Sequence, residues 1–252
     1  MLTPAQILNK TIAISKQKAN LKWWQMLLLG IFAGMFIALA ATGATFGNIY
    51  GGKLAGACIF TAGLAMVVIA GSELFTGNNL MLAALFDRQI SLTKLLKNWS
   101  LVFLGNFLGA LFIAALVTLS GIFNYSSDAV VTTAVTKTSL PFFEAMLRGI
   151  LCNLLVCIAV WMSFSADTVI SKIAAVFFPV MLFVLSGFEH SVANMFYIPA
   201  GMLQGAFSGI TAPTIEAFLL HNLLPVTLGN LIGGAIIVAS GYYLIYHHRK
   251  QQ

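Results

Sequence analysis

The chain has 252 residues, of which 60% are hydrophobic and only 8% are charged, and its mean hydropathy is +0.94. A soluble globular domain carries roughly 25% charged residues, so this composition excludes that class. The formal net charge is +6 at pH 7. The basic residues lie between apolar stretches instead of forming one patch, so no nucleic-acid partner is predicted. The composition indicates an integral membrane protein surrounded by a lipid bilayer.

The first predicted element is a short amphipathic helix in residues 3–16, TPAQILNKTIAISK. Thr3 is a suitable N-cap, Pro4 fits the first turn and Gln6 completes a capping box. We predict that residues 1–22 form a cytoplasmic N-terminal unit that either anchors the chain at the membrane surface or gates the cytoplasmic mouth. The unit lacks the charged stub and short apolar core of a cleavable signal peptide.

Apolar stretches long enough to cross a bilayer, which takes about 20 residues, follow this unit. They are predicted at 23–47, 54–86, 98–122, 142–165, 173–207 and 222–246. They indicate an all-α integral membrane protein with six transmembrane helices. The six-span domain is therefore predicted at 23–246, and a cytoplasmic tail at 247–252.

The lysine and arginine residues predict the orientation of the chain in an inner or plasma membrane. Of the 13, ten lie before the first stretch, between the second and third, between the fourth and fifth, or after the sixth. The other three are Lys53, Lys137 and Arg148. Cytoplasmic loops carry an excess of Lys and Arg, so both termini are predicted to be cytoplasmic.

Two polar segments interrupt the second and the fifth stretch, with the sequences GSELFTGN at 71–78 and GFEHSVAN at 187–194. A straight helix of about 33 residues would measure about 50 Å, whereas the hydrocarbon core is about 30 Å thick. Each stretch is therefore predicted to break into two half-helices. Irregular backbone is tolerated at that depth where it is buried in protein or lines a polar pathway. The breaks thus either serve packing alone or mark a transport site.

The sequence contains an internal repeat. The two interruptions share a glycine, a glutamate and an asparagine, LGNFLGA resembles LGNLIGG, and GIFAGMF resembles GILCNLL. The first residues of these pairs are 116, 124 and 119 positions apart, respectively. Each copy holds three spans, about 23–122 and 142–246, and an odd number of spans makes the second copy enter the membrane from the opposite side. We therefore predict an inverted 3+3 repeat with broken second and fifth helices.

The interruptions also carry ionisable residues. His190 is the side chain there that titrates near neutral pH. An ionisable residue within a transmembrane segment is a functional candidate, whereas a lone histidine in a soluble core is usually structural. Glu73 and Glu189 are predicted to accept hydrogen bonds from backbone N–H groups freed at the breaks, with proton transfer as the alternative.

Other function classes fit the sequence less well. A neutral-solute channel of the aquaporin type would carry Asn-Pro-Ala triplets, and the chain contains none. A membrane enzyme would need clustered His, Asp or Glu at depth, and a nucleotide-driven pump would need a phosphate-binding glycine loop. Cys58, Cys152 and Cys157 are odd in number and lie within apolar stretches, so no disulfide framework, metal site or cofactor is predicted.

Four motifs give the chain a family resemblance: ELFTGN, CNLLVCIAVWMSFSA, SGFEHSVANMFYIPAG and NLLPVTLGN. In this order they resemble the formate/nitrite transporter family, over nearly all six predicted spans. The resemblance implies a homopentamer in which each protomer encloses its own pore in an aquaporin-like arrangement. It also implies small monovalent weak-acid anions as substrates. VCIAVWMSFSA and NMFYIPAG resemble the formate-channel branch most, so formate is the predicted substrate, with nitrite or hydrosulfide as alternatives.

The same resemblance implies roles for individual residues. Thr76 and His190 match the threonine and the histidine that face the pore, and Glu189 precedes the histidine. The further matches are asparagines near the pore (Asn153 and Asn230), hydrophobic constrictions (Leu64, Phe75, Val156 and Phe183) and vestibule lysines (Lys137 and, by a looser alignment, Lys22). The loop between the fifth and sixth stretches is shorter than in the formate channels, which affects the outer rim and not the pore.

These residue types indicate how a weak acid crosses. Carrying a bare carboxylate through low dielectric costs of order 20 kcal/mol by an idealised estimate. Protonating an acid with a pKa of about 3.7 at pH 7 costs about 4.5 kcal/mol. The neutral acid therefore crosses two apolar constrictions more readily, after Lys137 and Lys22 have concentrated the anion at the mouths. Thr76 and His190 would hydrogen-bond the substrate, and His190 would either supply a proton or stabilise its charge.

Overall fold

The computed structural model describes residues 2–247, and these residues form helices joined by turns, with no strand among them. The all-α class predicted from the sequence is therefore confirmed. The predicted C-terminal tail lies outside the described residues, apart from His247.

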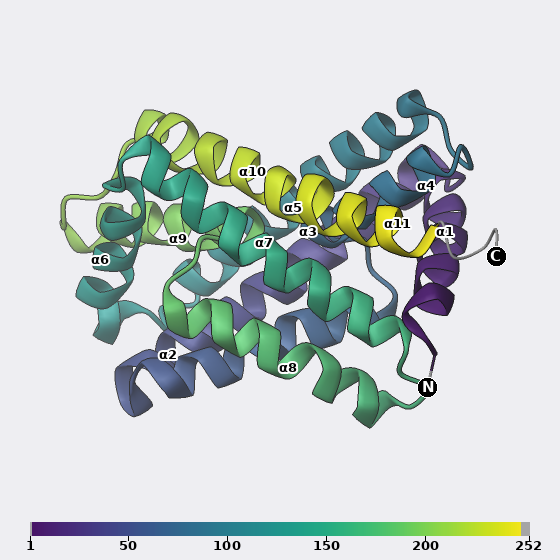
Figure 1. Cartoon of the computed structure of the whole chain (residues 1–252). Helices are drawn as coiled ribbons and strands as arrows, with labels where there is room; N and C mark the ends of the chain where they lie inside the picture. The colour runs from purple at the N-terminus through teal and green to yellow at the C-terminus, as the bar shows by residue number, and fades with distance from the viewer. Residues whose placement is uncertain (1, 248–252) are drawn as a thin grey trace.

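The helices follow one another along the chain as Figure 1 shows. The first ten elements are α1 (Pro4–Ala19), α2 (Trp23–Ala70), α3 (Phe75–Asn78), η1 (Asn79–Met81), α4 (Leu82–Phe86), α5 (Leu92–Leu119), η2 (Asn124–Ser126), α6 (Ser127–Thr138), α7 (Phe142–Phe164) and α8 (Val169–Ser186). They are followed by α9 (Ser191–Ser208), the π-helical η3 (Ala217–Leu223), α10 (Leu224–Leu231), the π-helical η4 (Ile232–Ala239) and α11 (Ser240–His247).

Five of the described helices are long and apolar enough to cross a membrane. They are Trp23–Ala70, Leu92–Leu119, Phe142–Phe164, Val169–Ser186 and the continuous helix Ala217–His247. The number differs from the six predicted stretches because the first stretch and the beginning of the second both lie in α2. The remainder of the second stretch is a shorter apolar segment, Phe75–Phe86.

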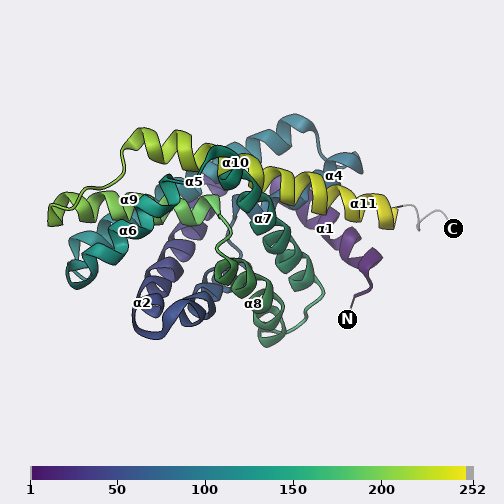
Figure 2. The same ribbon diagram turned by 60° about the vertical axis from the view of Figure 1, so that its left-hand side comes forward.

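α2 folds back on itself at Gly52. This glycine has φ 76° and ψ 176°, a left-handed φ that residues with a side chain rarely adopt. The two arms of α2 form a V in Figure 2. The two arms approach each other closely at Gly47 and Gly56, where a Cβ on Gly47 would lie 2.9 Å from the Cα of Gly56. α2 is therefore a helical hairpin although its residues are continuous.

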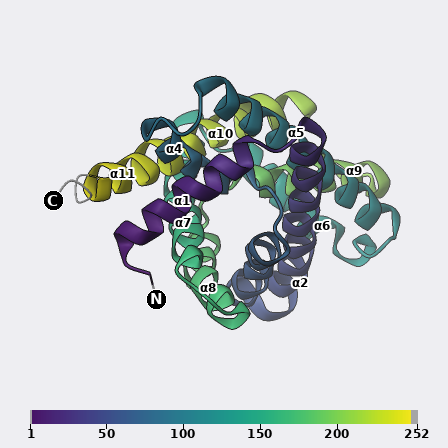
Figure 3. The same cartoon turned by 90° about the vertical axis from the view of Figure 1, so that its right-hand side faces the viewer.

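α1 and α6 lie at opposite ends of the molecule (Figures 1 and 2). α1 crosses the ends of the longer helices in Figure 3 and contacts α4, α7 and α11. Its start is the predicted capping box, which the structure confirms. The Thr3 N–H donates to Gln6 Oε1 (2.8 Å), and the Gln6 N–H donates to Thr3 Oγ1 (3.4 Å).

Glycines allow close helix packing in two equivalent places. Where α2 meets α5, a Cβ on Gly109 would lie 2.0 Å from the carbonyl oxygen of Ile31. Where α7 meets η4, a Cβ on Gly233 would lie 2.2 Å from the carbonyl oxygen of Ile150. These distances leave no room for a larger residue, so the backbones themselves are in contact. α2 therefore packs closely against α5, and α7 packs closely against η4.

Candidate functional site

Two non-helical segments, residues 71–74 and 187–190, separate pairs of helices. α2 ends before Gly71 and α8 ends before Gly187, whose φ values are 77° and 74°. Glycine adopts this left-handed conformation without the steric cost of a Cβ, which is why it commonly terminates helices. A new helix, α3 or α9, begins directly after each segment.

Asn106 of α5 holds the first segment. Its side-chain amide donates to the carbonyl oxygens of Gly30 (2.7 Å) and Glu73 (2.9 Å). Its Oδ1 accepts the backbone N–H of Phe75, the first residue of α3 (2.9 Å). One buried side chain therefore satisfies a donor and an acceptor that the interruption of the helix leaves free.

Asn230 of α10 holds the second segment with the same three contacts. Its amide donates to the carbonyl oxygens of Gly149 (2.8 Å) and Glu189 (3.0 Å), and its Oδ1 accepts the N–H of Ser191 (2.9 Å). Asn230 was predicted as a pore asparagine, whereas Asn106 was given no role. The repeat offers a signal for it, because the two asparagines stand at the same position of LGNFLGA and LGNLIGG.

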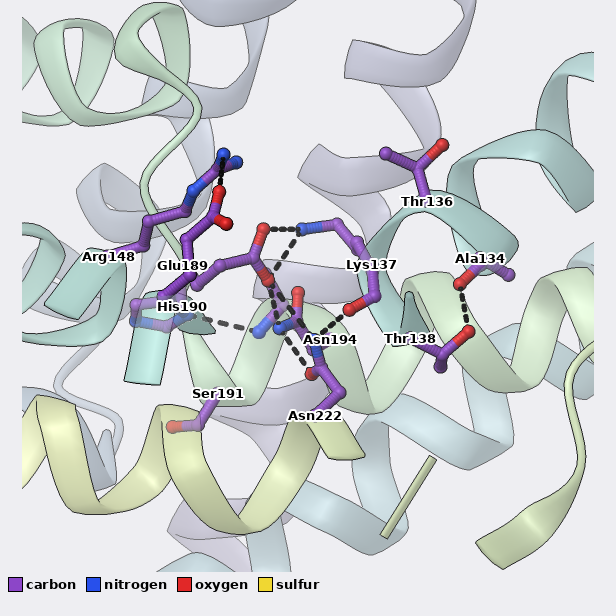
Figure 4. Close-up of polar contacts among 12 residues, drawn as sticks. Ala134, Thr136, Lys137, Thr138, Arg148, Glu189, His190, Ser191, Asn194 and Asn222 are labelled. Atoms are coloured by element: carbon purple, nitrogen blue, oxygen red, sulfur yellow. Dashed lines mark hydrogen bonds and ion pairs between the residues drawn. The ribbon is translucent and has the colours of Figure 1, made fainter. Parts of the chain in front are cut away.

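Glu189 lies at the centre of a buried polar cluster (Figure 4). Lys137 of α6 donates to both of its carboxylate oxygens, at 2.9 and 3.1 Å, and Asn194 donates to Oε2 at 2.6 Å. The Asn194 amide also donates to Asn222 Oδ1 (2.7 Å), and the Asn222 amide donates to the Lys137 carbonyl oxygen (2.8 Å). These contacts tie α6, α9 and η3 to the second non-helical segment.

Glu73 lies in a matching cluster at the first segment. Lys18 of α1 forms an ion pair with Glu73 Oε1 (3.1 Å), and Asn78 donates to Oε2 (2.7 Å). The Asn78 amide also donates to Asn98 Oδ1 (2.9 Å). In both clusters the carboxylate therefore accepts hydrogen bonds from side chains. The expectation that Glu73 and Glu189 accept backbone N–H groups was wrong, because asparagines satisfy the backbone instead.

The lysine that contacts the first segment is Lys18, and Lys22, predicted as a vestibule lysine, lies elsewhere. Lys22 is exposed at the N-cap of α2, where its backbone N–H donates to Gln25 Oε1 (2.9 Å). Lys18 was missed, although it lies 119 residues before Lys137, which is one of the three offsets of the internal repeat.

Thr76 and His190 come together from the two halves of the chain. Thr76 Oγ1 lies 2.9 Å from His190 Nε2, and both side chains are buried. His190 Nδ1 accepts the backbone N–H of Ala193 (3.0 Å) and so caps α9. Because Nδ1 is an acceptor, the neutral ring carries its proton on Nε2 and donates it to the Thr76 hydroxyl.

Two side chains of α7 donate hydrogen bonds to the backbone of Thr76. The Asn153 amide donates to the carbonyl oxygens of Thr76 (3.3 Å) and Asn230 (2.7 Å). Cys157 Sγ donates to the Thr76 carbonyl oxygen (3.3 Å). The predicted pore residues Asn153, Asn230, Thr76 and His190 are therefore brought together by direct contacts.

Three cavities follow one another from α1 to α6. The α1-side cavity has a volume of about 420 Å³, the central cavity about 10 Å³ and the α6-side cavity about 190 Å³. Leu64 and Leu74 line both the α1-side and the central cavity. Phe60, Phe183 and His190 line both the central and the α6-side cavity. The cavities are therefore in series, and the smallest one, the central cavity, is lined by apolar side chains and His190.

The predicted constriction residues are found in two environments. Leu64, Val156 and Phe183 line the central cavity. Phe75 is buried against α5, with its ring centroid 5.0 Å from that of Phe103 and 6.4 Å from that of Trp99. Phe60 and Leu74 also line the central cavity and were not predicted. Within an apolar stretch nothing in the sequence distinguishes their side chains from others that face lipid.

Comparison with known proteins identifies relatives over most of the chain. Residues 5–244 match the family described as "Formate/nitrite transporter". The "Formate channel FocA" of Haemophilus influenzae is 40% identical, covering 94% of this chain and 92% of the relative. The "Uncharacterized transporter YrhG" of Bacillus subtilis is 38% identical and the FocA of Escherichia coli K12 is 37% identical, each covering 98% of this chain and 95% of the relative.

Two solved structures have a similar fold. A "Pentameric formate channel with formate bound" is 32% identical with a TM-score of 0.76, covering 89% of this chain and 98% of the other. An "FNT family ion channel" is 30% identical with a TM-score of 0.80, covering 95% and 98%. These names describe channels and transporters, not enzymes, in agreement with the prediction that the chain is not an enzyme. The apolar helices and the match to nearly the whole chain show that this integral membrane protein belongs to the formate/nitrite transporter family.

Proposed function

We propose that the chain conducts small monovalent weak-acid anions, with formate as the first substrate. The observation that supports this most is the series of three cavities, in which His190 lines the smallest one and hydrogen-bonds Thr76. The FocA relatives are named formate channels, and one related structure holds formate. Nitrite and hydrosulfide are the alternatives, and a neutral solute is a weaker one.

The topology that we propose has six spans in an inverted 3+3 repeat, with both termini cytoplasmic. The two arms of α2 then serve as the first span and the first half of the second, and α8 with α9 forms the broken fifth span. The matching contacts of Asn106 and Asn230 support two related halves. Residues 1–22 lie over the cytoplasmic mouth, residues 23–246 form the channel domain, and five copies assemble, as in the related pentameric channel.

The permeation path that we propose runs from the α1-side cavity through the central cavity to the α6-side cavity. Leu64, Val156 and Phe183 form its constrictions, and we retain Phe75 as a constriction residue to be tested. A carboxylate in the narrow region would receive a hydrogen bond from the Thr76 hydroxyl, and one from the single N–H of the neutral His190 ring once that N–H turns from Thr76 to the substrate. Whether a proton accompanies the anion depends on His190, because it is the titratable group that touches this region.

The remaining predicted residues support the path. Asn153 and Asn230 fix the backbone around Thr76 and His190, and Glu189 with Lys137 holds the second non-helical segment from the α6 side. We retain Lys22 as a vestibule residue, although Lys18 is better positioned, since it contacts Glu73 and lines the α1-side cavity.

The test is substrate flux through the purified protein in liposomes. Formate, nitrite, hydrosulfide and acetate should be compared at equal concentration and pH, together with glycerol as a neutral solute. Formate should enter fastest, and glycerol should enter no faster than into empty liposomes. Rapid glycerol entry, or formate entry at the rate of empty liposomes, would show that the proposed function is wrong.

A further inference from the structure

The lysines closest to the non-helical segments have their charges balanced. Lys137 contacts the Glu189 carboxylate at 2.9 Å, and Lys18 contacts that of Glu73 at 3.1 Å. Each pair carries no net charge, so its electrostatic attraction for an anion falls off steeply with distance. A mouth that collects anions from solution therefore needs another cation.

Lys172 is such a cation at the α1-side cavity. It stands at the beginning of α8, lines that cavity and is partly exposed to solvent. Within residues 2–247, no carboxylate forms an ion pair with its ammonium group, and no acceptor forms a hydrogen bond with it. Lys10 lines the same cavity, but its ammonium already donates to the Phe164 carbonyl oxygen at 2.7 Å, at the end of α7.

Lys53 is the equivalent cation at the other mouth. It lies 119 residues before Lys172, the same offset that separates Lys18 from Lys137. It follows the turn at Gly52, and its Nζ would lie 3.8 Å from a Cβ on Gly187, which lines the α6-side cavity. Lys53 is exposed, and its ammonium likewise has no partner in the described part of the chain. Each mouth thus has one lysine that is paired with a carboxylate and one whose ammonium has no partner in the described part of the chain. At the α1-side mouth Lys10 also keeps its charge, but a carbonyl oxygen holds its ammonium in place.

We infer that Lys53 and Lys172 are the anion-collecting residues of the two mouths, one for each, and that they act on small monovalent anions. This inference rests on the proposed function, because it concerns how the substrate reaches the path. An unbalanced positive charge raises the local concentration of anions and so the rate at which they enter. The attraction of one exposed charge at about 5 to 10 Å in water corresponds to roughly a two- to fourfold change in this rate.

The experiment measures the initial rate of formate entry into vesicles in which the orientation of the protein is known. At about 10 mM ionic strength, Lys172→Gln should slow entry from the α1 side about two- to fourfold, and Lys172→Glu should slow it further. Lys53→Gln should have the same effect on entry from the α6 side. At about 0.5 M salt the differences should disappear, because the Debye length falls to a few ångströms.

Two controls separate steering from other effects. Lys97→Gln removes the same charge from an exposed residue of α5 outside the three cavities, and should leave entry unchanged. Lys172→Arg keeps the charge and should behave as wild type. The inference is overturned if formate enters through Lys172→Gln as fast as through Lys97→Gln at low salt. It is also overturned if the slower entry through Lys172→Gln persists at high salt. If the wild-type protein transports no formate, that result contradicts the proposed function instead. The same comparison of variants is then made with nitrite.

Discussion

Asn106 and Asn230 make the same three backbone hydrogen bonds at the two non-helical segments, although they lie 124 residues apart in sequence. Each receives the first N–H of the new helix and donates to a carbonyl oxygen of the interrupted segment and to one of a neighbouring helix. In a bilayer no water is available to replace these bonds. The two side chains therefore satisfy backbone groups that the non-helical segments would otherwise leave without a partner.

The first prediction concerns these two asparagines. Asn106→Ala and Asn230→Ala should each destabilise the protein, because a buried polar group left without a partner costs about 1 to 3 kcal/mol. Thermal unfolding in detergent should show lower transition temperatures for both variants and reduced formate flux. Asn124→Ala, on the exposed η2 turn, is the matched control and should unfold like wild type. Equal transition temperatures in all four proteins would rule out this role.

The second prediction concerns the proton. His190→Asn replaces the ring by a side chain that still caps a helix, as Nδ1 does, but cannot titrate. It should change the pH dependence of formate flux over roughly pH 5 to 8, where histidine ordinarily changes charge, or change whether the flux carries current. The oligomeric state, proposed to be a pentamer, should be the same as in the wild-type protein. The measurement is uptake and current across this pH range.

Thr76→Val and Thr76→Ser are the companion variants for His190. Valine has the shape of threonine without the hydroxyl that contacts His190 Nε2, whereas serine keeps the hydroxyl. Thr76→Val should slow formate, and Thr76→Ser should retain most of the flux. A His190→Asn variant that matches wild type in rate, pH profile and current would reduce His190 to a helix cap.

Much of this arrangement follows from polar residues that are conspicuous in an apolar sequence. The interruptions at Glu73 and Glu189 stand out because membrane helices rarely carry carboxylates. The offsets between similar motifs pair Asn106 with Asn230 and Lys18 with Lys137, so a systematic use of the repeat would have found both missing partners.

The apolar part of the path could not be predicted in the same way. Phe60, Leu74 and Phe75 are all aromatic or aliphatic residues in apolar stretches, and their sequence context is alike. Only the packing of the helices decides that Phe60 and Leu74 line the central cavity whereas Phe75 packs against Phe103. The fold at Gly52 was also not apparent, because glycine is common throughout these helices.

The third prediction concerns the buried ion pair of Lys137 and Glu189, whose side chains are 17% and 5% exposed. Removing one partner leaves a buried charge without compensation, which costs about 3 to 5 kcal/mol. Lys137→Met and Glu189→Gln should therefore each lower the unfolding temperature. The double variant should be more stable than the sum of the two losses implies, because no charge is left unpaired.

A control for this pair exists in the same protein. Arg148 and Glu144 form an ion pair one turn apart on α7 that is 38% and 45% exposed. Exposed pairs contribute about 0 to 1 kcal/mol, so Glu144→Gln should unfold close to wild type. Additive losses in the Lys137 and Glu189 double variant would mean that the two side chains act independently.

The last prediction separates the two phenylalanines among the constriction residues. Phe183 lines the central and α6-side cavities, and its ring lies 5.9 Å from that of Phe60. Phe183→Ala removes this ring and should increase the entry of acetate and lactate relative to formate.

Phe75→Ala removes a buried ring that packs against α5, and truncation of such a ring costs about 3 to 5 kcal/mol. It should lower the unfolding temperature more than Phe183→Ala does. If it also raises the ratio of acetate to formate entry while the protein stays folded, Phe75 acts as a constriction residue, as the family resemblance implies. If neither variant changes that ratio, size selection takes place elsewhere on the path, and Leu64→Ala and Val156→Ala are the variants to compare next.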